Sequence, residues 1–114
     1  MSFLPVEVGR LTALEDLDLR YCCSLTCIPS EIGNLPNLLR LNRSYCFQLK
    51  TLPADIGNLK ALEDLDLRSC HSLTRLPAEI GVLSTLKRLD LSCCSRLKSL
   101  PADIGNLKAL EDLD

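Results

Sequence analysis

The chain has 114 residues, the size of one domain, and its 15 acidic and 13 basic residues give a formal net charge of -2 at pH 7. This near balance excludes the global positive field that draws proteins to nucleic acid or to an anionic membrane surface. The start, MSFLPVEVGR, has no basic region followed by an apolar run, and no later segment approaches the roughly 18 apolar residues of a membrane span. We therefore expect a cytoplasmic chain that binds neither nucleic acid nor membrane.

Residues 1–10 already belong to a repeat of 24 residues that runs through the chain. Its most regular positions are Pro5, Pro29, Pro53, Pro77 and Pro101, then Gly9, Gly33, Gly57, Gly81 and Gly105, and then Leu11, Leu35, Leu59, Leu83 and Leu107. A fixed period of this length indicates a solenoid, in which stacked units contact mainly their neighbours. We expect a single domain over residues 1–114 with about 4.75 repeats, open or truncated at both ends.

The first complete unit predicts a short strand, tight turns and a single helical turn. Leu17-Asp18-Leu19 alternates apolar and charged residues, which is the period-2 pattern of a strand whose leucines point inward. After the turns, Pro29 opens a short turn or one helical turn, as proline does at a first helical position, and Gly33 lies near its end. Parallel strands are thus expected near residues 16–20, 40–44, 64–68 and 88–92.

Each unit follows LxxLxLxxCxxLxxLPxxIGxL, which resembles the leucine-rich repeat family over the whole chain. Cysteine where many repeats carry asparagine, together with LPxxIG, is similar to the plant-type repeats of intracellular disease-resistance receptors. The resemblance implies an α/β repeat solenoid, a right-handed arc with a short-stranded parallel β-sheet on the concave face and turns or short helices on the convex face. It also implies protein recognition as the usual task.

The second unit breaks the leucine frame at Arg43. The row to which this residue belongs is otherwise Leu19, Leu67 and Leu91. A charged group that points into a leucine core costs several kcal/mol unless its head reaches water or finds partners. A functional role stays open, but a tolerated defect is the favoured interpretation, so replacing Arg43 by leucine should raise stability.

The fifth unit begins as a copy of the third. Residues 52–66 and 100–114 both read LPADIGNLKALEDLD, which indicates duplication of a pair of units. The sequence stops at Asp114, inside the strand motif, as in a fragment or an open-ended product. Apolar rows at uncapped ends could lead to self-association.

Four of the seven cysteines recur once per unit, namely Cys22, Cys46, Cys70 and Cys94. A solenoid needs a small buried side chain at this position, so weak donation from these thiols to loop carbonyls is a simpler interpretation than disulfides. The other three, Cys23, Cys27 and Cys93, lack paired metal-ligand spacing. We predict that all seven are reduced, and that the chain holds no metal and no cofactor.

The concave face should carry charges that alternate from unit to unit. One row reads Asp16, Arg40, Asp64, Arg88 and Asp112, and beside it runs an acid-rich row, Asp18, Asn42, Asp66, Asp90 and Asp114. Exposed cross-strand pairs contribute roughly 0.2–1 kcal/mol each. A self-neutralising charge ladder therefore explains most of this surface without a ligand.

The first two units differ from the rest of this face. Tyr21 and Tyr45 are the only tyrosines and occupy equivalent positions, while Leu39 interrupts a row that is otherwise charged. Interface centres favour aromatic and arginine side chains, so we expect a protein-binding site at Tyr21, Leu39, Arg40 and Tyr45. The alternative, that scattered exposed apolar residues need no explanation, stays open.

The expected function is that of a non-enzymatic protein-protein interaction module, similar to the recognition or autoinhibitory repeat region of a plant-type intracellular immune receptor. A stand-alone intracellular scaffold or signalling adaptor is the alternative. An enzyme fragment is a more distant alternative. The chain has a single histidine, His71, and no Gly-rich phosphate loop, so no catalytic machinery can be identified in it. The identity of the partner protein is left open.

Overall fold

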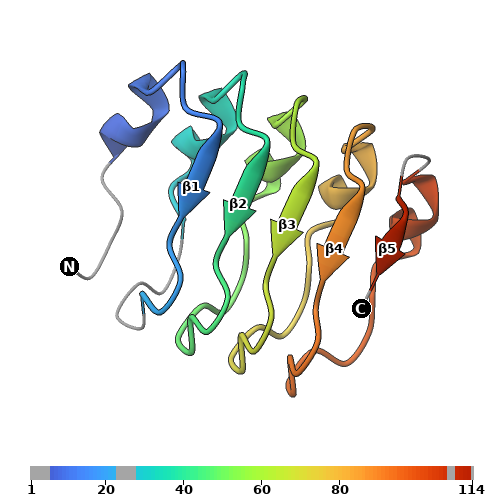
Figure 1. The fold of residues 1–114 in the computed structure, drawn as a ribbon. Coiled ribbons are helices and arrows are strands. Elements are labelled where there is room, and N and C mark those ends of the chain that lie inside the picture. Colours follow the sequence, from blue (N-terminus) through green and yellow to red (C-terminus); the bar gives the residue numbers. More distant parts are fainter. Residues whose placement is uncertain (1–5, 23–27, 108–109, 114) are drawn as a thin grey trace.

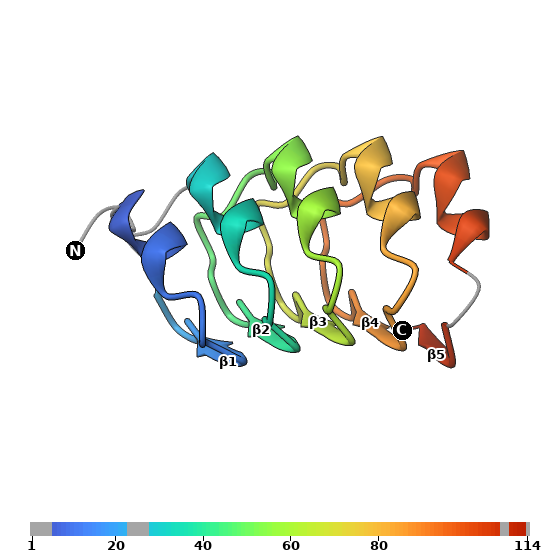
Figure 2. The same ribbon diagram turned by 90° about the horizontal axis from the view of Figure 1, so that it is seen from above.

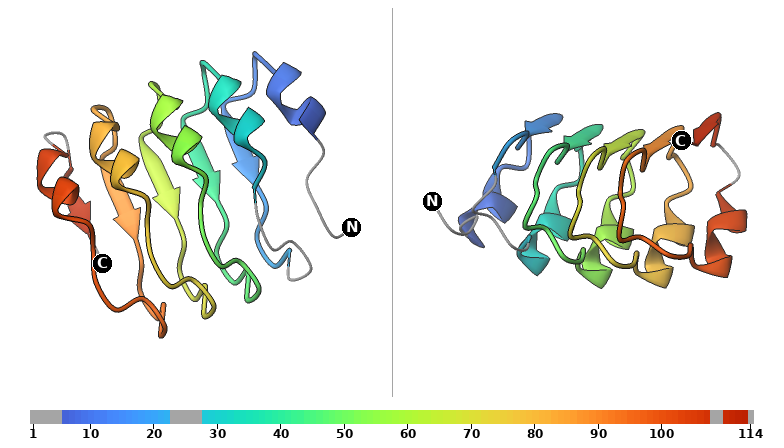
Figure 3. Two further views of the ribbon diagram at one scale, coloured as in Figure 1. Left: turned by 180° about the vertical axis from the view of Figure 1, so that it is seen from behind. Right: turned by 90° about the horizontal axis from the view of Figure 1, so that it is seen from below.

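The computed structural model describes residues 6–22, 28–107 and 110–113. In this part of the chain, five short strands form one parallel sheet in the order β1-β2-β3-β4-β5, and a 3-10 helix precedes each strand (Figure 1). The elements are η1 (Val6–Arg10), β1 (Asp16–Asp18), η2 (Ser30–Asn34), β2 (Arg40–Asn42), η3 (Ala54–Asn58), β3 (Asp64–Asp66), η4 (Ala78–Val82), β4 (Arg88–Asp90), η5 (Ala102–Asn106) and β5 (Asp112–Leu113). The sheet lines the inner side of an arc and the 3-10 helices line its outer side (Figure 2, Figure 3), which confirms the expected solenoid.

The strands pair in the register that the repeat predicts. Leu17 lies opposite Leu41 in the first pair of strands, and the same row continues along the sheet. Backbone hydrogen bonds extend the ladder beyond the strand ends, since the amide of Leu19 donates to the carbonyl of Asn42 at 2.8 Å. The four predicted strands are confirmed, and β5 is a further one.

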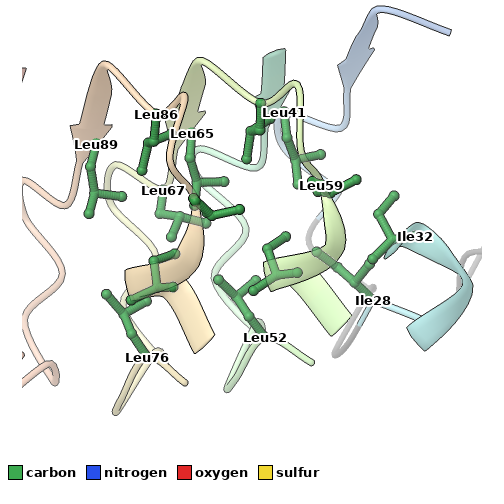
Figure 4. Close-up of a cluster of buried hydrophobic side chains, with 14 of the residues drawn as sticks. Ile28, Ile32, Leu41, Leu52, Leu59, Leu65, Leu67, Leu76, Leu86 and Leu89 are labelled. Atoms are coloured by element: carbon green, nitrogen blue, oxygen red, sulfur yellow. The ribbon is translucent and has the colours of Figure 1, made fainter. Parts of the chain in front are cut away.

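The core lies between the sheet and the 3-10 helices (Figure 4). Leu41 and Leu65 enter it from the strands, Ile56 and Leu59 enter it from the outer side, and all four are exposed by 1% or less. Complete burial of such a side chain contributes roughly 1.5–3 kcal/mol. The leucine frame is therefore the main stabilising feature of the arc.

The 3-10 helices from η2 to η5 each follow a proline. Pro29 is extended (φ -66°, ψ 153°) and caps η2, whereas the sequence pattern placed it at the first helical position. The ring fixes only φ, and this value is compatible with both conformations. Near the end of η3, a Cβ on Gly57 would lie 2.9 Å from the carbonyl oxygen of Glu79 in the next unit, so glycine lets consecutive 3-10 helices stack closely.

Candidate protein-binding site

Each of the first four strands ends in the same side-chain turn. The amide of Arg20 donates to Oδ1 of Asp18 at 3.1 Å, an Asx turn that sets the direction of the chain after β1. Equivalent bonds of 3.0 Å join the amides of Ser44, Arg68 and Ser92 to Asn42, Asp66 and Asp90. The acid-rich row of the sequence thus has a structural role, which asparagine fulfils as well as aspartate.

The residue that follows this turn adopts a left-handed backbone conformation. Its φ is 61° at Tyr21, Tyr45 and Cys93 and 58° at Ser69. The conformation costs an L-residue roughly 1–2 kcal/mol, a cost that glycine avoids. Because four units share it, the conformation belongs to the repeat. In the first two units it places a tyrosine at the side of the sheet where the strands end.

Tyr21, Tyr45, Phe47 and His71 form a continuous run of ring contacts, here termed the aromatic ladder. Tyr21 stacks on Tyr45 with ring centroids 4.9 Å apart and an interplanar angle of 11°. Phe47 meets Tyr45 edge to face at 6.5 Å and stacks on His71 at 5.1 Å. Tyr21 is 63% exposed and Phe47 is 39% exposed. The ladder is therefore an accessible aromatic strip across three successive units, and interfaces favour such groups as anchors.

The structure brings together only part of the predicted site. Tyr21 and Tyr45 are in contact, but Leu39 precedes β2 and Tyr45 follows it, so the two lie toward opposite ends of the strand. Leu39 is half-buried. Arg40 is exposed and pairs with Asp16 at 3.6 Å. Leu39 and Arg40 therefore belong to the concave face, whereas the tyrosines belong to its edge.

Phe47 and His71 were absent from the predicted site. They occupy the same position in consecutive units, 24 residues apart, and equivalent positions of a solenoid lie side by side. This aromatic row is the signal that could have identified them. The contact of Phe47 with Tyr45, two residues earlier, joins it to the tyrosine row.

The concave face carries the charge ladder that the sequence predicts. Arg88 pairs with Asp64 at 3.7 Å, and Lys87 pairs with Glu63 at 4.0 Å. Burial raises the pKa of Asp64 by more than the Arg88 guanidinium lowers it. At the end of β1, the hydrogen bonds from Arg20 lower the pKa of Asp18. Each of these pairs is at least partly exposed and contributes little to stability, and together the pairs neutralise part of the acid on this face.

Arg43 is fully buried in the row that other units fill with leucine. Its backbone takes part in the regular ladder, since its amide donates to the carbonyl of Asp66 at 2.8 Å. The side chain therefore enters the core, where Nε, Nη1 and Nη2 have no hydrogen-bond partner among the described residues. The predicted conflict between this residue and the leucine core is confirmed.

The buried thiols of the cysteine row donate to main-chain oxygens. Sγ of Cys46, Cys70 and Cys94 lies 3.2, 3.1 and 3.0 Å from the carbonyl oxygens of Leu19, Arg43 and Leu67, respectively. Burial raises the pKa of the Cys70 thiol to about 12 and also raises the pKa of Cys94. The predicted role as small buried donors is confirmed at these three positions, while Cys23 and Cys27 lie outside the described residues.

Within residues 6–22, 28–107 and 110–113, no group of three or more His, Cys, Asp or Glu side chains could hold a metal ion. Each 3-10 helix in these ranges has 5 residues, which is too short to span a membrane. That the chain takes no metal and no cofactor stays a prediction.

Solved structures with the same architecture are similar to this chain over nearly all of its length. The leucine-rich repeat domain of the type III effector XopL is 32% identical, with a TM-score of 0.91 over 98% of this chain and 38% of that one. A leucine-rich repeat protein of Leptospira interrogans is 34% identical, with a TM-score of 0.68 over 100% of this chain and 34% of that one. The Arabidopsis receptor kinase HAESA, in complex with the peptide hormone IDA and the co-receptor SERK1, is 28% identical, with a TM-score of 0.76 over 98% of this chain and 19% of that one.

The chain thus spans 38% or less of the length of each of these proteins. The search of curated proteins found no match. A family model described as a leucine-rich repeat region matches residues 45–114, and one described as a leucine rich repeat matches residues 13–35. Since the first of these matches covers more than half of the sequence, the chain belongs to the leucine-rich repeat family.

Proposed function

We propose that the chain is a non-enzymatic protein-binding module whose contact centres on Tyr21 and Tyr45. One observation carries the proposal: Tyr21 is 63% exposed while its ring stacks on Tyr45, so the pair offers a preorganised aromatic surface to solvent. A partner that crosses β2 from this edge would reach Leu39 and Arg40 at the other end of the strand. The paired charges elsewhere on the concave face influence the rate of association more than the affinity.

Membership in the leucine-rich repeat family supports this function. Repeats of this kind stack into extended concave surfaces that suit the recognition of other macromolecules. HAESA, which is similar over 98% of this chain, was solved with a peptide and a protein bound. We therefore infer that the ligand of this chain is a protein or a peptide segment.

The function can be tested by selecting binders from a phage-displayed library of random peptides on the intact chain. Alanine at Tyr21 or Tyr45 should lower the affinity for the selected peptides roughly tenfold or more, which is the range of an aromatic interface anchor. Alanine at Glu63 or Lys87, which pair with each other at 4.0 Å, should change affinity by less than about threefold. Equal effects of both pairs of substitutions, or the failure to select any peptide, would contradict the proposal.

We further propose that this module serves a receptor, as the recognition or autoinhibitory region of a plant-type intracellular immune receptor. The cysteine row and the LPxxIG motif support this finer role. The test is the sequence of the full transcript that encodes these repeats. Fusion to a nucleotide-binding module would support the receptor, and fusion to any other domain would count against it.

A further inference from the structure

Acidic and basic residues are segregated within each unit. The segments 19–30, 43–54, 67–78 and 91–102 contain no Asp or Glu, although they hold seven of the 13 Lys and Arg residues. Each of the last three segments runs from the end of a strand, through the turn that follows, to the start of the next 3-10 helix. The turns of these three segments lie along the lower edge of the molecule in Figure 1. Three of the seven are used elsewhere, since Arg43 is buried in the core and Arg20 and Arg68 pair with acids at the strand ends. The other four give this edge a positive charge even though the net charge of the chain is -2.

Four of these cations are free to meet a partner. They are Lys50, Arg75, Arg96 and Lys98, here termed the basic edge, and all four are exposed. The ion pairs among the described residues all involve other cations, on the concave face or at the strand ends. The basic edge thus has neither a neighbouring acid in its own segments nor an ion pair within the described structure.

The aromatic ladder and the basic edge are neighbours in the second and third units. Phe47 lies three residues before Lys50, and His71 lies four residues before Arg75. Two hydrogen bonds hold these segments side by side: Ser72 Oγ donates to the carbonyl of Phe47 at 2.6 Å, and the amide of Thr74 donates to the carbonyl of Lys50 at 3.3 Å. In the second and third units, an exposed ring and an unpaired cation consequently lie within four residues of each other on adjacent segments.

We propose that this edge binds an acidic, extended segment of a partner protein that carries an aromatic or aliphatic anchor. The proposal rests on the protein-binding function proposed above and specifies the chemistry of the partner. The anchor packs on the aromatic ladder, and the acidic side chains face the basic edge.

The concave face is unsuited to the same segment. Among the described side chains of its rows, the acids are Glu15, Asp16, Asp18, Glu63, Asp64, Asp66, Asp90 and Glu111, against the bases Arg20, Arg40, Arg68, Lys87 and Arg88. This excess of acids repels an acidic segment and directs it to the edge. It also disfavours nucleic acid, whose recognition relies on a basic surface.

Fluorescence anisotropy of labelled 12-residue peptides on the intact chain tests the proposal. One peptide places glutamates around a single phenylalanine, a second carries glutamine in place of glutamate, and a third carries lysine. The glutamate peptide should bind most tightly, with an affinity that falls as salt is added. The double substitution Lys50→Gln and Arg75→Gln should lower the affinity for the glutamate peptide roughly fivefold. The matched double substitution Arg10→Gln and Lys60→Gln removes the same charge outside these segments and should change affinity less than about twofold.

Several results would overturn the acidic partner. They are equal binding of the glutamate and glutamine peptides, tighter binding of the lysine peptide, equal effects of the two double substitutions, or tighter binding of a single-stranded RNA 12-mer. The protein-binding function would fail separately. Displayed peptides that depend on Tyr21 and Tyr45 but lack acidic residues would preserve that function while refuting the acidic partner.

Discussion

At the residue scale, Arg43 is where the sequence and its surroundings conflict most. Its backbone is held in the regular ladder, and its guanidinium lies in the core without a hydrogen-bond partner among the described residues. We predict that Arg43→Leu raises the free energy of unfolding by about 1–3 kcal/mol, because it removes a buried unpaired charge and restores apolar contact. Urea unfolding followed by circular dichroism measures the change.

The control for this substitution is Arg40→Leu. Arg40 is exposed and its ion pair with Asp16 is long, at 3.6 Å, so this change should alter stability by less than about 0.5 kcal/mol. A loss of stability in Arg43→Leu would show that the guanidinium has a partner in solution.

The cysteines make a second residue-scale prediction, because their reactivity follows their burial. With its pKa raised to about 12, Cys70 has a thiolate fraction of only ~10⁻⁴ at pH 8, and the thiolate is the nucleophile. Brief alkylation of the native chain at pH 8 should therefore modify the exposed Cys93 and spare Cys70 and Cys94. Tandem mass spectrometry locates the label, with the denatured chain as the fully reactive control. Rapid labelling of Cys70 would contradict the link between burial and reactivity. Disulfide-linked peptides would contradict the prediction that all seven cysteines are reduced.

At the element scale, stacking of the 3-10 helices depends on glycine. A Cβ on Gly57 would lie 2.9 Å from the carbonyl oxygen of Glu79, whereas a Cβ on Gly105 would meet nothing within 4 Å. Gly57→Ala should therefore destabilise the chain by about 1–3 kcal/mol through overpacking against the next unit. Gly105→Ala is the matched control in the same local sequence and should be neutral or slightly stabilising. Equal melting temperatures for the two variants would exclude close stacking as the reason for glycine.

The strands could be predicted from sequence because Leu17 and Leu19 alternate with a charged residue, a pattern that depends only on local geometry and one buried face. The aromatic ladder could be predicted only in part. Tyr21 and Tyr45 are equivalent by the repeat, but the contact between Tyr45 and Phe47 depends on the left-handed turn between two rows. The turn is held by a hydrogen bond from the Ser44 amide to the Asn42 side chain. From the sequence alone, Asn42 could be recognised only as one member of an acid-rich surface row.

At the scale of the whole molecule, the two ends of the arc expose part of the core. Leu11 is 52% exposed at one end and Leu100 is 39% exposed at the other. A second copy that continued the sheet would bury these leucines. The charge ladder opposes this contact, because its alternation places Glu15 at the first strand and Glu111 at the last.

We therefore predict that like charges limit self-association and that Glu15→Lys strengthens it. Stacked in register, a second copy would bring its Glu15 beside Glu111, and like charges directly opposite destabilise a sheet. Glu15→Lys converts this repulsion into attraction and should make the free energy of association more favourable by about 0.5–2 kcal/mol. Sedimentation equilibrium at low salt measures the change. Combining Glu15→Lys with Glu111→Lys restores like charges and should return the wild-type behaviour.

The salt dependence of association gives a second test. Added salt should strengthen association of the wild type and weaken that of the single variant. Identical behaviour of all three proteins would mean that copies do not meet through their ends.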